Sequence, residues 1–92
     1  YLDVELTIYW HTARIYFELG EYQQVLKHVT AGIEAAVSND SLFLLDELYA
    51  LRAQALEQLG DQEAESTYAI AKALARVNQS RNLETFLNSA TA

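Results

Sequence analysis

The sequence contains no proline, no cysteine and no methionine, and only three of its 92 residues are glycine. β-Sandwiches and β-barrels need frequent turns, which proline and glycine supply, so this scarcity argues against an all-β fold. Without cysteine, disulfide bonds and thiolate metal sites are excluded. The chain begins at Tyr1, inside an apolar pattern and without methionine, so we expect a fragment of a longer protein.

Long apolar runs and clusters of basic residues are also missing. No run of about 18 uncharged apolar residues and no signal-peptide pattern is present, so we expect a soluble chain that does not engage a membrane. Residues 1–65 carry three basic and twelve acidic residues, a net charge of −9, whereas residues 66–92 carry a net charge of +2. An acidic surface repels phosphate backbones, so we expect no direct contact with nucleic acid.

The residue types that are abundant favour helices. Hydrophobic residues make up 51% of the chain and aromatic residues 11%, which is too much for intrinsic disorder. Alanine, leucine, glutamate and glutamine are common, and all four are strong helix formers. The sequence therefore predicts one all-α domain over residues 1–92.

Apolar periodicity divides this domain into about five helices. Four are predicted at about residues 4–19, 21–37, 41–59 and 62–77, and a short fifth helix at about residues 80–90. The polar segments 38–41 and 78–80 are predicted to separate helices. The apolar residues expected to pack on the last helix are Leu83, Phe86 and Leu87.

Individual residues predict where the helices begin and end. Asp3 is placed to cap the first helix, and either Asp40 or Ser41 is placed to cap the third. Gly20 and Gly60 are predicted to end the first and third helices, because glycine adopts the left-handed conformation of a C-terminal cap most easily.

The layout repeats after forty residues. Segments 18–22 and 58–62 place a leucine, a glycine and an acidic residue at matching points. Small residues also recur in both units, Ala13 and Ala53 before the glycine and Gly32 and Ala71 after it. Small residues let antiparallel helices approach closely, so we predict two helix-turn-helix repeats at about residues 3–37 and 41–77. Stacked arrays usually need about three repeats, so we expect self-association to cover the end faces.

These repeats resemble the tetratricopeptide repeat family over about residues 3–76, the second after deletion of one residue following Asp61. Val25 departs from the family pattern, which has alanine there, and no proline closes either unit. The interval is forty residues rather than 34, with six extra residues between Asn39 and Tyr49, where the third helix is expected to start early. The resemblance implies an α-α superhelix of helical hairpins. The matching residues are Tyr9, Ala13, Tyr16, Gly20, Tyr22, Leu26, Val29 and Gly32 in the first unit, and Tyr49, Ala53, Leu56, Gly60, Asp61, Ala64, Tyr68 and Ala71 in the second.

A narrower resemblance lies in the third predicted helix. Residues 41–53, followed by Leu59-Gly60-Asp61, are similar to degenerate repeats in the Rgg/PlcR/PrgX-type transcription regulators of Gram-positive bacteria. This resemblance implies a cytoplasmic homodimer whose repeats bind a short signalling peptide on the concave side, joined to an N-terminal DNA-binding domain that this chain lacks. The alternative is a generic tetratricopeptide scaffold that docks a protein partner and has no signalling role.

In such arrays the first helix of each pair lines the concave groove. Arg14 is suited to bind a carboxylate such as a peptide C-terminus. Gln54 and Gln58 are suited to bind an extended peptide backbone. Trp10 and Phe17 either anchor an apolar side chain or belong to the core, and Arg14 either faces the groove or only pairs with Glu18. The candidate peptide-binding residues are Trp10, Arg14, Phe17, Glu47, Gln54 and Gln58.

Signatures of catalysis are absent from the sequence. His11 and His28 lie on different predicted helices without the spacing of a helical metal site, so we expect them at the surface. No phosphate-binding glycine loop or nucleophile motif is present. We therefore expect neither enzymatic activity nor a metal or cofactor.

Overall fold

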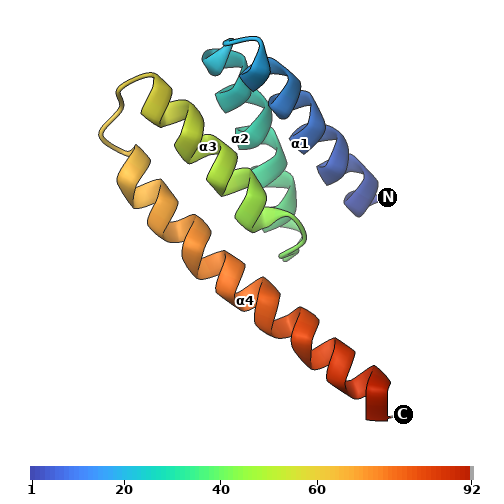
Figure 1. Cartoon of the computed structure of the whole chain (residues 1–92). Coiled ribbons are helices and arrows are strands. Elements are labelled where there is room, and N and C mark those ends of the chain that lie inside the picture. The colour runs from blue at the N-terminus through green and yellow to red at the C-terminus, as the bar shows by residue number, and fades with distance from the viewer. Residues whose placement is uncertain (92) are drawn as a thin grey trace.

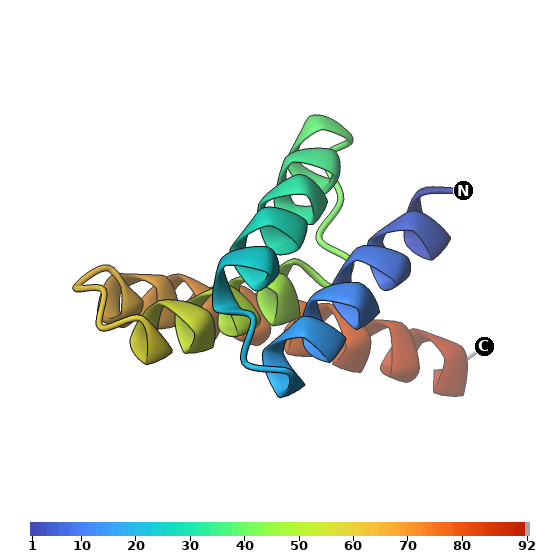
Figure 2. The same ribbon diagram turned by 90° about the horizontal axis from the view of Figure 1, so that it is seen from above.

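The computed structural model describes the backbone of residues 1–91 and the side chains of residues 1–79. It consists of four helices, α1 (Leu2–Glu18), α2 (Tyr22–Ser38), α3 (Leu45–Gln58) and α4 (Ala64–Thr91). Consecutive helices lie side by side and form two hairpins, α1/α2 and α3/α4 (Figure 1). Seen from above, the first hairpin is turned relative to the second (Figure 2). The prediction of an all-α, repeat-like fold is confirmed, with four helices in place of about five.

The two glycine turns have the same geometry. Gly20 and Gly60 adopt left-handed conformations, with φ angles of 76° and 71°. In each turn the acidic residue after the glycine donates its backbone N–H to a carbonyl five residues back, Glu21 to Tyr16 and Asp61 to Leu56, at 2.9 Å in both cases. These bonds satisfy carbonyls that the helix end would leave unpaired. The predicted helix ends at both glycines are confirmed.

The N-terminal cap predicted for the first helix is wrong. α1 begins at Leu2, so Asp3 lies within its first turn, and Tyr1 occupies the cap position without a side-chain hydrogen bond. Negative charges in the first turn still interact favourably with the positive end of the helix dipole. Asp3 therefore acts through its charge.

The third helix starts later than predicted. Asp40 and Leu44 both adopt left-handed conformations, with φ angles of 51° and 58°, and a helix cannot continue through such residues. Ser41 donates its N–H to Ala36, and its hydroxyl accepts from the N–H of Phe43, so it closes a turn and does not cap α3. Most of the six extra residues of the repeat therefore form a loop over residues 39–44.

The break predicted at residues 78–80 is also wrong, because α4 continues through this segment to Thr91. Asn78 lies within the helix and its side-chain amide donates two hydrogen bonds, to the Leu42 carbonyl at 2.9 Å and to the Asp46 carboxylate at 2.8 Å. The first bond attaches the loop over residues 39–44 to α4, and the second attaches the first turn of α3 to it. The side chains of Leu83, Phe86 and Leu87 lie outside the described residues.

The core contains two clusters along α3, each with buried residues from α1, α2 and α3. The first lies where α3 packs on α1 and α2, and the second lies nearer the loop over residues 39–44. Close packing at their centre depends on Gly32, because a Cβ atom there would lie 3.2 Å from side-chain atoms of both Leu48 and Tyr9. The buried residues are Ala13, Val25, Val29, Leu48, Leu51 and Ala55 in the first cluster, and Leu6, Ala36 and Leu45 in the second.

We expect Gly20→Ala and Gly60→Ala each to lower the free energy of unfolding by about 1–2 kcal/mol, the cost of a left-handed alanine. A Cβ atom at either position meets nothing within 4 Å, so the cost comes from the backbone alone. Chemical denaturation measures the effect. Asp40→Gly is the contrasting variant and should not lower stability; unchanged stability in both alanine variants would contradict this account.

We expect Asn78→Ala to lower the free energy of unfolding by about 1–3 kcal/mol, because two partly buried hydrogen bonds are lost, one of them to a carboxylate. Gln79→Ala is the matched control, since Gln79 is exposed on the same helix. Thermal and urea denaturation should distinguish the two variants, and equal stabilities would show that Asn78 does not attach the loop.

Candidate functional site

A small hollow of about 130 Å³ lies between α1 and α3. On α1 the lining residues are spaced i, i+4, and on α3 they are spaced i, i+3, i+4 and i+7, so each set occupies one helical face. Four of the six candidate residues line this hollow. The lining residues are Trp10, Arg14, Glu47, Ala50, Leu51 and Gln54.

The floor and one wall of the small hollow are apolar. Leu51 is only 3% exposed and belongs to the first core cluster, so it forms a fixed floor. Trp10 is partly buried against the same cluster, and its ring meets the His11 ring edge-on with 4.9 Å between centroids. Trp10 therefore packs against the core and also lines the hollow, and its role as an anchor for an apolar ligand side chain stays a prediction.

The rim of the small hollow carries charge. The Arg14 guanidinium lies 3.7 Å from the Glu18 carboxylate, and the two side chains are 48% and 70% exposed. A surface pair of this kind contributes at most about 1 kcal/mol, so a ligand carboxylate can compete for Arg14. Glu47 and Gln54 on α3 add a carboxylate and an amide to the same rim. Arg14 therefore lines the small hollow and also pairs with Glu18, and its binding of a ligand carboxylate stays a prediction.

Two candidates lie outside the small hollow. Phe17 packs against the first core cluster, and its ring contacts the Tyr22 ring with centroids 5.3 Å apart. Gln58 is the last residue of α3 and is exposed. Helical spacing places Gln58 one turn beyond Gln54 on α3, but only Gln54 lines the small hollow.

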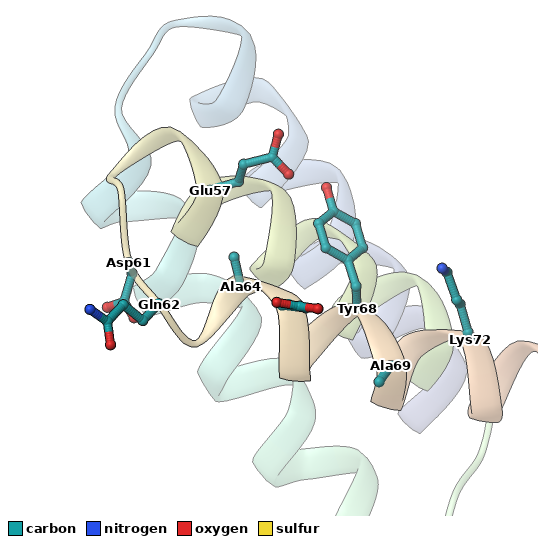
Figure 3. A pocket seen from close by; sticks show the side chains of 8 residues that line it. Glu57, Asp61, Gln62, Ala64, Tyr68, Ala69 and Lys72 are labelled. Atoms are coloured by element: carbon teal, nitrogen blue, oxygen red, sulfur yellow. The ribbon is translucent and has the colours of Figure 1, made fainter.

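A larger hollow of about 800 Å³ lies over the turn between α3 and α4 (Figure 3). Four of its lining residues are charged, three of them acidic. This site was not predicted from the sequence, because its side chains follow no chemical motif. The signal that could have indicated it is that polar residues occupy repeat positions that are apolar in the first unit. The lining residues are Glu57, Asp61, Gln62, Ala64, Glu65, Tyr68, Ala69 and Lys72.

Tyr68 is a partly buried titratable residue in the lining of this hollow. The Glu57 side chain on α3 points toward the Tyr68 hydroxyl (Figure 3). Desolvation by burial raises the pKa of Tyr68 above its usual value near 10, and the negative charge of Glu57 and a hydrogen bond to it raise it further. The neutral phenol is therefore favoured in the folded chain, which suits a hydrogen-bonding role.

In the described part of the chain, no three His, Asp or Glu side chains cluster so that they could hold a metal ion. No described helix is both long enough and apolar enough to cross a membrane. Comparisons with protein-family models, curated proteins and solved structures find no match to this chain.

We expect Glu57→Gln to lower the pKa of Tyr68 but to leave it above the usual value, because desolvation, the largest cause, persists. An NMR titration of the Tyr68 ring measures this shift. With a raised folded-state pKa, the stability contributed by neutral Tyr68 is complete below pH 10 and is lost as the pH rises through the folded pKa. Glu63→Gln is the control, since Glu63 does not line the hollow; an equal shift in that variant would exclude Glu57 as the specific cause.

Proposed function

We propose that this chain is a peptide- or protein-binding module, and that the small hollow between α1 and α3 receives one end of an extended peptide. The observation that carries the proposal is the convergence of Trp10, Arg14, Glu47 and Gln54 from two helices around one hollow. None of these four side chains is required at its position by burial alone, since each remains partly or fully exposed.

The chemistry of the rim favours a peptide C-terminus. Arg14 offers a guanidinium for a carboxylate, and charge-assisted hydrogen bonds of this kind are the stronger ones in water. Gln54 offers both a donor and an acceptor to a neighbouring peptide group. The Trp10 ring and the Leu51 floor accommodate an apolar side chain next to that terminus.

The size of the small hollow limits what enters it. A volume of 130 Å³ corresponds to about four water molecules, which is room for one terminus or one side chain. The rest of the ligand would extend over the surface of α1 and α3. The ligand is therefore a flexible segment, not a folded surface.

We further propose that the chain is the peptide-sensing and dimerising part of a bacterial helix-turn-helix transcription regulator, with DNA bound by a separate domain. This role rests on the resemblance of residues 41–53, of which residues 41–44 precede α3. The structure offers a physical route for such sensing. α1 and α3 belong to different hairpins, so a ligand that touches both favours one arrangement of the hairpins over others.

The alternative function is a scaffold that docks a protein partner without signalling. The larger hollow favours it, because about 800 Å³ of open, charged surface suits a protein segment better than a single terminus. The parent sequence distinguishes the two. A helix-turn-helix DNA-binding domain ahead of Tyr1 supports the regulator, and any other domain there supports the scaffold.

We expect Arg14→Ala to weaken binding of octapeptides with a free C-terminus by about 1–3 kcal/mol, the cost of a lost charge-assisted hydrogen bond. The probe is an immobilised library of octapeptides, screened with the chain and followed by calorimetry on the enriched sequences. Amidation of the peptide C-terminus should produce a similar loss in the unsubstituted chain and little further loss in Arg14→Ala.

Gln58→Ala is the matched control, because Gln58 lies on α3 but outside the small hollow. It should bind peptides as the unsubstituted chain does. A screen that enriches no octapeptide, or peptides that bind equally well to Arg14→Ala and Gln54→Ala, would sink the proposal.

A further inference from the structure

The larger hollow corresponds, by the internal repeat, to the surface on which α3 packs in the first unit. Positions match at an offset of forty residues up to Asp61 and of 39 residues after it. Phe17 and Val29, which pack in the first core cluster around α3, thereby correspond to Glu57 and Tyr68 of the larger hollow. The first unit holds a helix at this place, whereas in the second unit the place is open.

By the same correspondence, one side of α1 matches the side of α3 that packs on the first unit. We define the outer face of α1 as Val4, Ile8, His11 and Ile15. Its aliphatic members are 57–60% exposed, which is unusual for three such residues on one side of a helix. The matching residues of the second unit are Leu44, which directly precedes α3, and Leu48, Leu51 and Ala55 of α3, which are buried in the first core cluster.

We infer that the larger hollow is a docking site for a second copy of this chain, which inserts the outer face of its α1 against α3 and α4. One chain carries both halves of this contact, at opposite ends of the repeat. The contact therefore joins unlike surfaces head to tail, and each added copy leaves both surfaces available at the ends of the assembly. This inference is independent of the peptide site, which lies between α1 and α3 of one copy. It replaces the closed homodimer that the family resemblance implies with an open head-to-tail series.

The polar substitutions on the two surfaces are complementary. Where α3 packs on the first unit, the buried Leu51 of α3 lies in a cluster with Phe17 and Val29. In the contact between copies, His11 takes the place of Leu51, and Glu57 and Tyr68 take the places of its two partners. A histidine thus meets a carboxylate and a phenol where the first unit has only apolar groups, so both surfaces changed from apolar to polar at corresponding points.

A second pair of positions also matches. Within one copy, Arg52 donates a hydrogen bond of 2.9 Å to the Thr30 hydroxyl, across the contact of α3 with α2. The corresponding residues between copies are Thr12 and Ala69, both small. The change removes the guanidinium of Arg52 and the hydroxyl of Thr30 together, and the one polar group left at this point is the small hydroxyl of Thr12.

Sedimentation of the chain tests the contact. The mean mass should rise from 10.4 kDa for the monomer through a series that continues beyond the dimer as the concentration increases. Ile15→Lys places a charge on the outer face of α1, and Ala69→Glu places one in the larger hollow. Each should weaken self-association at least about tenfold, which corresponds to about 1.4 kcal/mol.

Mixing these two variants distinguishes a head-to-tail contact from a two-fold one. Ile15→Lys retains an intact hollow, and Ala69→Glu retains an intact α1 face, so the mixture should form a one-to-one dimer with the affinity of the unsubstituted chain and stop there. If copies instead met α1 to α1, Ala69→Glu would self-associate by itself, and the inference would be wrong.

The controls keep each substitution on an exposed site outside both surfaces. Ala73→Glu lies on the same helix as Ala69 and corresponds to the exposed Glu34, and Gln24→Lys is exposed on α2. Both should self-associate normally. Circular dichroism checks that every variant is helical, and Lys72→Glu replaces Ala69→Glu if the latter fails to fold. A chain that stays monomeric up to millimolar concentration, or variants that do not complement each other, would overturn the inference.

Discussion

The packing of α3 against α1 and α2 is the interaction on which the rest of the structure depends. It is closest at Gly32, where a Cβ atom would lie 3.2 Å from atoms of Leu48 and Tyr9, and this approach brings three helices together around one residue without a side chain. α4 packs mainly on α3, so its position also follows from this contact. The small hollow is a direct consequence, because Leu51 is both a member of the first core cluster and the floor of that hollow.

The same contact explains why the chain has two chemically different ends. In the middle of the repeat, α3 covers apolar residues of α1 and α2, and those residues are buried. At the α1 end, the aliphatic side chains that match the packed face of α3 are exposed. At the α4 end, the positions that match the surface under α3 carry acidic and basic groups. The small hollow lies between these ends, so the peptide and the second copy that we propose would occupy separate surfaces.

Prediction from the sequence succeeded for features that depend on residues close together in the chain. Gly20 and Gly60 predict two helix ends, because glycine is the residue that a left-handed cap favours, and helical spacing brought four of the six candidate side chains to one hollow. It failed where the cause is not local. Asp40 and Leu44 are left-handed without being glycine. Asn78, which is typical of a loop, lies in a helix and donates hydrogen bonds to Leu42 in the loop over residues 39–44 and to Asp46 on α3. The larger hollow follows from which residues an adjacent helix leaves uncovered, and no sequence pattern records that.

The continuity of α4 has a mechanical consequence. α4 contains 28 residues, which at 1.5 Å per residue is a rod of about 42 Å, whereas α3, the helix that supports it, contains half as many. A tilt of α4 by about 5° about its N-terminal end would therefore displace the far end by roughly 3–4 Å, given that length. Any change in how α3 packs on the first hairpin is therefore amplified along α4. A small rearrangement around Gly32 produces a displacement of a few ångströms at Thr91, given that length.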